Sequence, residues 1–217
     1  MSGPARWVRP VVLEGSIVRL EPLSLEHLEG LAAVGLEPSI WRWMPTLPRD
    51  ADELRAWVDS ALEAQSAGRE LPFAQVERAS GRPVGSTRLL NLEPAHRRLE
   101  VGYTWLAPAW QRTALNSEAK LLLLRHAFEA LDPSALRVEF KTDARNVASR
   151  RALAGIGATE EGTLRRHMLV QGGERRDSVY FSVIAEEWPA VRQRLAERVR
   201  RLAGAATMAQ EATADGT

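Results

Sequence analysis

The sequence predicts a single α/β (α+β) domain, built on a mixed, mostly antiparallel twisted sheet with helices on both faces. Its 217 residues, 45% of them hydrophobic, suit one globular domain. Apolar residues recur at helical spacing near both ends of the chain but alternate in its middle. Hairpin signals join neighbouring strands, and two later helices act as crossovers between strands, which makes the sheet mixed.

The first third of the chain is predicted to form one strand and two helices. The strand is "SIVRLEPL", and Ser24 then has the residue type of an N-cap for the helix "LEHLEGLAAVG". An aromatic, proline-broken loop follows at "PSIWRWMPTLP". The next helix, "ADELRAWVDSALEAQSAG", has apolar residues at helical spacing and ends at Gly68.

The middle of the chain is predicted to form most of the sheet. Strands are expected at "PFAQVER", "PVGSTRLLNL" and "RRLEVGYTWL", and the turn "ASGR" joins the first two as a hairpin. A helix is expected from about Ser117 to Leu131. The strand "LRVEFKT" alternates, with Leu136, Val138 and Phe140 on one side.

The last third is predicted to close the domain. Asn146 is the expected N-cap of the short helix "NVASRRALAGIG", which stops at Gly157. A second hairpin joins "GTLRRHMLV" to "DSVYFSVI" through the turn "QGGER". A terminal amphipathic helix carries Trp188, Val191, Leu195 and Val199 on one face, which suits packing on the core or on a partner.

These elements divide the chain into four parts. We expect an N-terminal arm (1–14), a folded domain (15–188), a C-terminal helix (189–204) and a small, polar, disordered tail (205–217).

Composition and charge exclude several classes of function. The formal net charge of +1 gives no strong global field for nucleic acid or an acidic membrane. The absence of cysteine excludes disulfides, thiolate metal sites and a cysteine nucleophile. No apolar run approaches the roughly 18 residues that span a bilayer, and the start of the chain has no signal-peptide block. We therefore expect a cytoplasmic protein. Only two of the 29 basic residues are lysines, a bias that we attribute to genome composition or thermal adaptation.

Three stretches in this order resemble the GCN5-related N-acetyltransferase (GNAT) superfamily, in particular its RimJ/RimL-type branch of ribosomal-protein-alanine N-acetyltransferases. They are "LEVGYTWLAPAWQRTALNSEA", "RVEFKTDARNVASRRALAGIGATEEGTLRRH" and "RDSVYFSVIAEEW". The second is the most specific, because residue types, spacing and expected elements all agree. The resemblance runs from about Gly15 to Trp188 and implies a single-domain GNAT fold with acetyl-CoA as co-substrate.

The resemblance implies a pyrophosphate-binding loop at a strand-to-helix corner. In the family the loop Q/R-x-x-G-x-G/A points backbone N–H groups at the coenzyme A pyrophosphate. The matching residues here are Gln111, Arg112, Thr113, Ala114, Leu115 and Asn116. Both family glycines are replaced, by alanine and asparagine, although the backbone donors remain. The helix dipole at Ser117 and the Arg112 cation would favour an anion. Taken alone, the loop fits a plain surface turn better, whereas the surrounding pattern favours the pyrophosphate loop.

The strand before this loop is the expected pantetheine site. In the family this strand binds pantetheine along its backbone and donates an N–H to the thioester carbonyl. The matching backbone here belongs to Tyr103, Thr104, Trp105 and Leu106. Gly102 would mark a bulge that opens the strand. The alternative is that these are ordinary sheet residues and that Gly102 is a packing gap.

Acid and base candidates come from the same resemblance. The family's asparagine contacts pantetheine, and its serine or a nearby tyrosine protonates the thiolate, which points to Asn146 and Ser149 here. Glu100, two residues before Gly102, is the expected base, because a partly buried carboxylate with a raised pKa accepts a proton through water. The alternatives are a helix cap for Asn146, a solvent-facing Ser149, and an ion pair of Glu100 with Arg97, Arg98 or a neighbouring strand.

Weaker candidates complete the site. Asp177 is a second possible base, in a turn that equally suits solvent, and His167 has a residue type that titrates near neutrality but is more often structural. The family's acceptor loop lies between the first two helices, where Trp41, Trp43 and Met44 would shape an acceptor pocket. Aromatic packing is the alternative for these three.

The combined hypothesis is an acyl-CoA-dependent N-acyltransferase. It would move an acetyl group from acetyl-CoA to a primary amine, either a protein N-terminus or a small molecule, by direct attack in a ternary complex. The alternatives are another donor such as succinyl-CoA, or a non-catalytic acyl-CoA-binding module. The spacing offers no metal cluster and no strong nucleic-acid or membrane signal, and both a homodimer and a monomer are compatible with it.

Overall fold

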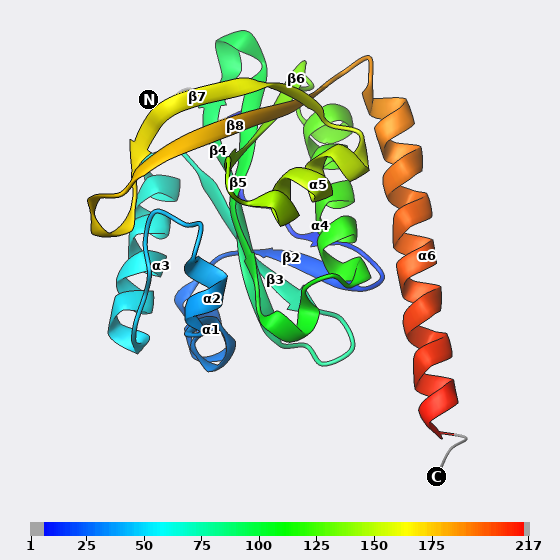
Figure 1. The fold of residues 1–217 in the computed structure, drawn as a ribbon. Coiled ribbons are helices and arrows are strands. Elements are labelled where there is room, and N and C mark those ends of the chain that lie inside the picture. The colour runs from blue at the N-terminus through cyan, green and yellow to red at the C-terminus, as the bar shows by residue number, and fades with distance from the viewer. Residues whose placement is uncertain (1–6, 215–217) are drawn as a thin grey trace, which may run out of the picture.

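The computed structural model describes residues 7–214, and Figure 1 shows their course. The strands are β1 (Leu13–Glu14), β2 (Val18–Pro22), β3 (Leu71–Glu77), β4 (Pro83–Glu93), β5 (Arg98–Leu106), β6 (Arg137–Asp143), β7 (Thr159–Leu169) and β8 (Arg175–Ile184). The helices are α1 (Leu28–Gly35), α2 (Pro38–Trp41), α3 (Ala51–Ser66), α4 (Ala114–Arg125), α5 (Val147–Ile156) and α6 (Trp188–Ala214).

All strands join one sheet in the order β1-β2-β3-β4-β5-β6-β8-β7. Every neighbouring pair is antiparallel except β5 and β6, which run parallel because α4 crosses between them. The predicted fold class, a mixed and mostly antiparallel sheet in a single α/β domain, is therefore confirmed.

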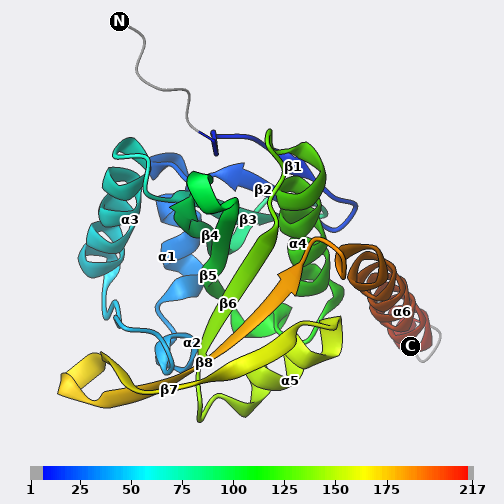
Figure 2. The ribbon, with the colours of Figure 1, turned by 90° about the horizontal axis from the view of Figure 1, so that it is seen from above.

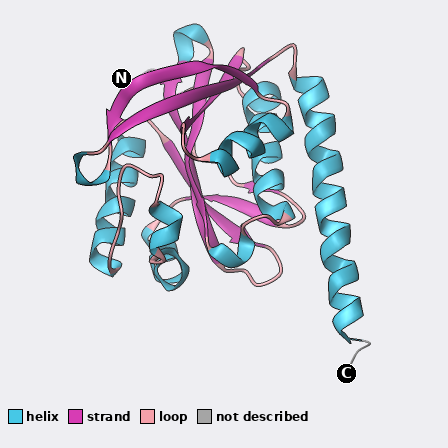
Figure 3. Cartoon of the chain, viewed as in Figure 1, coloured by secondary structure: helices cyan, strands magenta, loops and turns pink. Residues whose placement is uncertain are grey.

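Helices cover both faces of the sheet, as Figure 3 shows. Seen from above, α1 and α3 lie on one side and α4 and α6 on the other (Figure 2). Each side has its own hydrophobic core. The smaller core gathers three tryptophans, Trp41, Trp57 and Trp105, whose ring centroids lie 5.3–6.4 Å apart. The larger core lies under α4, α5 and α6. Strands β5 and β6 are inner strands of the sheet, so they lie between these two cores.

A buried carboxylate anchors α4 to the first hairpin. Glu118 is only 6% exposed, and its two oxygens accept hydrogen bonds from the backbone N–H groups of Ser16, Ile17 and Val18 and from the Ser16 hydroxyl. These donors lie at the start of β2, about 100 residues earlier in the chain. The network holds the N-terminal half of α4 against the sheet.

The ends of the chain differ from the prediction. We expected a disordered tail from residue 205, but α6 runs to Ala214; only residues 215–217 of that tail lie outside the described residues. In the expected arm, residues 1–6 also lie outside them, whereas Val8 is buried in the larger core and Leu13–Glu14 forms β1. No helix in the described part of the chain is long and apolar enough to cross a membrane.

Three internal details also differ. The aromatic loop contains the short helix α2, because Glu37 caps it and Pro38 suits its first turn. Helix α4 begins at Ala114 and not at Ser117, since Thr113 is the N-cap and the apolar first turn is buried. Leu136 is 46% exposed because it precedes β6, so it does not share the buried side of Val138.

Candidate active site

Strands β5 and β6 pair at only one end. Their register covers Arg98 to Glu100 on β5 and Arg137 to Glu139 on β6. Both strands continue well beyond this point without pairing to each other. The separation leaves the β6-facing backbone of β5 without a strand partner, and such backbone can bind an extended, amide-containing ligand.

A bulge in β5 widens this opening. Gly102 pairs with Arg88 and Trp105 with Ser86, so Tyr103 and Thr104 together face one residue of β4. Tyr103 has a φ of 49°, in the left-handed region. The bulge therefore lies one residue after Gly102. Gly102 itself leaves room beside the base candidate, because a Cβ there would lie 3.0 Å from Glu100 Oε1.

A cleft of about 340 Å³ fills the opening, a size typical of small-molecule sites, which span roughly 300–1,000 Å³. One wall is β5, from Glu100 to Thr104. The opposite wall consists of β6 with Lys141 and α5 with Asn146 and Ser149. The two walls bring most of the predicted chemical groups into one space.

Glu100 lies at the point where the strands separate, with only 2% of its surface exposed. Burial raises the pKa of its carboxyl group, and Lys141 and Asn91 counteract part of this rise. Asn91 Nδ2 donates to Oε2 at 2.8 Å, and Lys141 Nζ lies 3.6 Å from the same oxygen. Its ion pair is therefore with the neighbouring strand. Arg98 pairs instead with Glu93 and Glu139.

Asn146 and Ser149 lie together at the start of α5. Asn146 is the N-cap, as predicted, and its Oδ1 accepts a hydrogen bond of 3.0 Å from the Ser149 N–H. Both residues also line the cleft, so capping leaves the Asn146 amide group beside the ligand space. Ser149 is therefore part of the cleft wall and is not simply a solvent-facing residue.

The expected pyrophosphate loop lies outside the residues that line the cleft. Arg112, with a φ of 63°, takes the left-handed position of this loop, whereas Ala114 and Asn116 are helical. The left-handed conformation that glycine favours is thus two residues before the first matched glycine position and four before the second. Gln111 Nε2 donates to Leu106 O at 2.9 Å, which ties the loop back to β5.

The first turn of α4 is the other part of this loop. Ala114 and Leu115 are buried, and the Ser117 hydroxyl accepts from Arg198 Nε of α6 at 3.1 Å. Lys120, one turn further along α4, lines the cleft and donates to Asn116 Oδ1 at 2.7 Å. Burial, together with the neighbouring Arg198, lowers the pKa of Lys120 to about 8.

Trp105 and Leu106 do not line the cleft. Both are buried, and the Trp105 ring packs in the tryptophan core 5.3 Å from the Trp41 ring centroid. The Trp105 carbonyl accepts a hydrogen bond from Gln75 Nε2 at 3.1 Å. The part of β5 that lines the cleft is therefore Glu100 to Thr104, and the expected pantetheine segment stays a prediction.

The three residues predicted for the acceptor loop have two different environments. Trp41 is fully buried, and its Nε1 donates to Gly35 O at 2.6 Å, so for this residue the packing alternative holds. Trp43 and Met44 line the cleft, and their role in acceptor binding stays a prediction.

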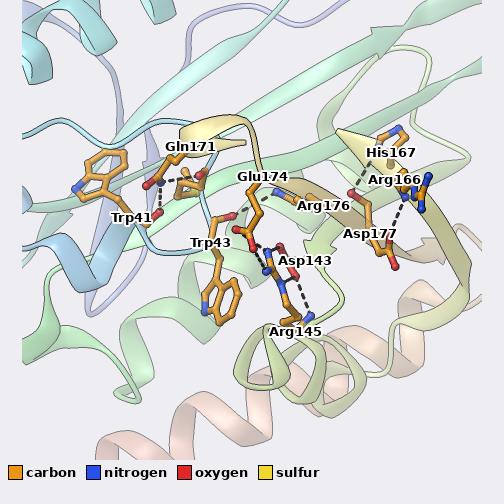
Figure 4. Close-up of polar contacts among 12 residues, drawn as sticks. Trp41, Trp43, Asp143, Arg145, Arg166, His167, Gln171, Glu174, Arg176 and Asp177 are labelled. Carbon is orange, nitrogen blue, oxygen red and sulfur yellow. Dashed lines mark hydrogen bonds and ion pairs between the residues drawn. The ribbon is translucent and has the colours of Figure 1, made fainter. Parts of the chain in front are cut away.

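The β7–β8 hairpin holds the acceptor loop in place, as Figure 4 shows. Gln171, at the tip of this hairpin, donates from Nε2 to the carbonyl oxygens of Trp41, Met44 and Thr46 at 2.8, 2.8 and 3.2 Å. These bonds join segments about 125–130 residues apart in the chain. One amide side chain therefore binds the backbone of the predicted acceptor loop at three positions.

Two arginines of the described chain also contact Trp43 of the predicted acceptor loop. Arg176, 5% exposed, lines the cleft and donates from Nη1 to Trp43 O at 3.3 Å. Arg145 is paired with Asp143 and Glu174, and its guanidinium lies 5.2 Å from the Trp43 ring centroid (Figure 4). Trp43 is thus held from both its backbone and its ring.

The two other titratable candidates lie apart from the cleft lining. Asp177 accepts from the Arg166 N–H at 2.6 Å, and both residues lie beside His167 in Figure 4. His167 Nδ1 lies 3.1 Å from Ser178 Oγ, and burial together with Lys141 and Arg176 lowers its pKa. These contacts suit hairpin structure better than proton transfer to a ligand in the cleft.

Sequence reasoning missed Lys120, Lys141, Gln171 and Arg176. The two lysines carried a signal, because they are the only ones in an arginine-rich chain. Gln171 and Arg176 carried none, since a polar turn residue and one arginine among many are typical of a solvated hairpin.

Comparison with known proteins agrees with this geometry. The profile described as "Acetyltransferase (GNAT) domain" matches residues 18–159. A GCN5-related N-acetyltransferase from Brucella melitensis has a similar structure, with a TM-score of 0.81 and 31% identity; the match covers 90% of this chain and 86% of that one. Mycobacterium smegmatis RimJ in complex with CoA-disulfide is similar at a TM-score of 0.70 and 25% identity, over 87% and 92% of the two chains.

One curated relative also matches. It is the uncharacterized N-acetyltransferase YoaA of Bacillus subtilis (strain 168), 33% identical over 101 residues. The match covers 46% of this chain and 55% of the relative, so it spans only about half of either protein. The family profile matches most of the domain, and the Brucella melitensis protein is 31% identical and is covered over 86% of its length. These two matches establish the family. The chain belongs to the GNAT acetyltransferase family.

Proposed function

We propose that the protein transfers an acetyl group from acetyl-CoA to a primary amine by direct attack in a ternary complex. The observation that carries the proposal is Glu100, a buried carboxylate at the point where β5 and β6 separate. It faces a cleft of about 340 Å³ with unpaired strand backbone on one side and Asn146 and Ser149 on the other. Family membership supports acyl transfer from acetyl-CoA.

The base role of Glu100 rests on its environment. Burial raises the pKa of its carboxyl group toward the range in which proton transfer at neutral pH is efficient. Gly102 places no side chain beside Oε1, where a Cβ would lie 3.0 Å away, and an amine or a bridging water would approach the carboxylate from the cleft. Glu100 would take the proton of the acceptor amine, and the freed lone pair would attack the thioester carbonyl.

The donor side rests on backbone groups and α5. The backbone of Gly102 to Thr104 would bind the pantetheine amides, and an N–H of this segment would stabilise the oxyanion. Asn146 would donate its amide to the pantetheine arm, and Ser149 would protonate the leaving thiolate. The corner at Arg112 and the N-terminus of α4 would bind the pyrophosphate.

The acceptor lies on the side of Trp43 and Met44. We place the chain near the RimJ/RimL-type branch, a placement supported by its similarity to RimJ of M. smegmatis. The acceptor would then be a protein N-terminus, with a small-molecule amine as the alternative. A cytoplasmic location and a homodimer stay predictions.

Isothermal titration with acetyl-CoA, succinyl-CoA and free CoA tests the donor assignment. Micromolar binding of acetyl-CoA, followed by acceptor-dependent release of free thiol, is the expected result. Preference for succinyl-CoA would change the donor and keep the reaction type. Binding without thiol release for peptide and small-molecule amines would favour a non-catalytic acyl-CoA-binding module, and no binding would overturn the proposal.

A further inference from the structure

Lysine is nearly absent from this chain, and both lysines line the cleft. Of 29 basic residues, only Lys120 and Lys141 are lysine. They come from different elements, α4 and β6, yet both contribute to the wall of the same cleft. Arginine stays protonated in proteins, whereas lysine loses its proton when buried and is the usual target of acylation. The side-chain amines of this protein are therefore confined to the expected acyl-donor site.

The two lysines differ in their partners. Lys141 Nζ pairs with Glu100 Oε2 at 3.6 Å and lies 5.9 Å from the Tyr180 ring centroid. Lys120 Nζ donates to the neutral Asn116 amide oxygen at 2.7 Å, and no carboxylate in the described part of the chain forms an ion pair with it. The nearby carboxylate of Glu118 is occupied by the start of β2.

The surroundings of Lys120 favour its neutral form. Burial removes water from the ammonium group, and Arg198 adds a like charge, so its pKa falls to about 8. With this pKa, roughly a tenth of the side chains carry a nucleophilic neutral amine at pH 7. Lys120 is thus an amine nucleophile among the residues that line the cleft.

We propose that the protein acylates itself at Lys120. The inference rests on the proposed function, because the acyl group comes from acetyl-CoA in the same cleft. The neutral Nζ attacks the thioester carbonyl carbon, a C–N bond forms, and the C–S bond breaks. The proton lost by the nitrogen passes to the thiolate. The products are N-acetyl-lysine at position 120 and free CoA, so no further reactant is needed.

Acetylation at Lys120 would change the cleft itself. It replaces an ammonium with a larger neutral amide in the lining of the cleft that is proposed to hold the pantetheine arm. We expect the modified protein to bind acetyl-CoA more weakly than the unmodified protein. The modification would then accumulate when acetyl-CoA is abundant and the acceptor is scarce.

Mass spectrometry of the purified protein tests the proposal. The protein is incubated with acetyl-CoA and no acceptor, and its intact mass and peptides are followed over time. We expect one added acetyl group at Lys120 and its loss in Lys120→Arg, and peptide mapping should find no acetyl group at Lys141. Excess free CoA should slow the modification. Urea-denatured protein, which has no cleft, should label both lysines slowly and equally.

The pH dependence sharpens the test. A lysine with a pKa of about 8 gains about tenfold in neutral amine between pH 7 and pH 9, and the curve bends near pH 8. A lysine with its ordinary pKa gains about a hundredfold over the same range without bending. A steep, unbending rise would mean solution acetylation and would overturn the proposal.

Titration of the same preparation with acetyl-CoA separates the two hypotheses. Binding without acetylation at Lys120, or acetylation at Lys141 or the N-terminus alone, overturns self-acylation and leaves the proposed function standing. No binding overturns the proposed function and self-acylation together.

Discussion

Glu100 of β5 and Lys141 of β6 face each other across the point where the two strands separate, with Lys141 Nζ 3.6 Å from Glu100 Oε2. Glu100 is the last residue of β5 in register with β6, and Lys141 lies two residues beyond the last paired residue of β6. Burial raises the pKa of Glu100, and the ammonium of Lys141 limits that rise. The lysine thereby tunes the carboxylate that we propose as the base.

Replacing Glu100 with glutamine should remove the base without changing the shape of the cleft. We expect Glu100→Gln to lower kcat/KM by about 10²- to 10⁴-fold, the usual contribution of general acid–base catalysis. The affinity for CoA should stay the same, because the pantetheine segment is backbone. Steady-state kinetics and CoA titration check both.

Asp177→Asn is the matched control, since its carboxylate binds the Arg166 N–H away from the cleft lining. Normal activity is expected. If Asp177→Asn were inactive and Glu100→Gln active, the base assignment would be reversed.

Removing Lys141 should shift the pH profile in a defined direction. The ammonium stabilises the ionised form of Glu100, so Lys141→Met should raise the pKa of that carboxyl group further. The acidic limb of kcat/KM reports deprotonation of the base, and this limb should move to higher pH. Lys141→Arg, which keeps the charge, should leave the limb close to its original position. An unchanged limb in Lys141→Met would mean that Glu100 is not the titrating group.

Gln171 should control acceptor binding from outside the cleft. Gln171→Ala removes the donor to three carbonyl oxygens of the acceptor loop. Each such hydrogen bond contributes about 1 kcal/mol, so we expect the KM for the acceptor to rise about tenfold or more. CoA affinity should be unaffected. Gln193→Ala on α6, which removes only a bond to Glu197, is the control. Equal losses for acceptor and CoA would indicate general misfolding instead.

The sequence predicted the sheet because alternation and helical spacing are local signals. Asn146 and Gly157 were identified as helix caps from residue type alone, and both were correct. The start of α4 was placed three residues late, because Ser117 is also a common cap and the burial of Ala114 and Leu115 depends on the distant sheet.

Site residues could be predicted from the sequence where they belong to a local motif. They could not be predicted where two segments distant in the chain come into contact. Glu100, Ser149 and Asn146 came from the family pattern, and all three line the cleft. Gln171 contacts a segment about 130 residues away, and no local pattern indicates such a contact. Trp41 was indistinguishable from Trp43 in sequence, because which one is buried depends on the turn after α2.

Glu118 should matter for stability and not for chemistry. Glu118→Ala would leave the backbone N–H groups of Ser16, Ile17 and Val18 without their acceptor. The Val18 N–H is buried, whereas the other two donors are partly open to water. An unsatisfied buried donor costs about 1–3 kcal/mol, so the free energy of unfolding should fall by about that amount. Glu118→Gln, which keeps one acceptor oxygen, should lose less. Urea unfolding measures both, and Glu197→Ala on α6 is the surface control. A loss below about 1 kcal/mol for Glu118→Ala would show that water replaces the carboxylate.

Variants of Arg112 should distinguish the effect of backbone conformation from the effect of charge at the proposed pyrophosphate corner. Its left-handed backbone, with a φ of 63°, costs an ordinary residue about 1–2 kcal/mol, whereas glycine adopts it readily. Arg112→Gly should therefore fold at least as stably as the original chain. It loses the side-chain cation, so CoA should bind somewhat more weakly. Arg112→Glu reverses the charge beside a pyrophosphate, and we expect about a tenfold increase in Kd at low salt. The effect should shrink at high salt, because the residue is exposed.

Arg125→Glu makes the same charge change at the opposite end of α4 and should leave the Kd unchanged. This comparison decides whether the corner binds phosphate, because a general charge effect would weaken CoA binding equally in both glutamate variants. Equal weakening would place the pyrophosphate elsewhere. A loss confined to Arg112→Glu, with Arg112→Gly intermediate, would mean that backbone donors and a side-chain cation act together at a loop without glycine.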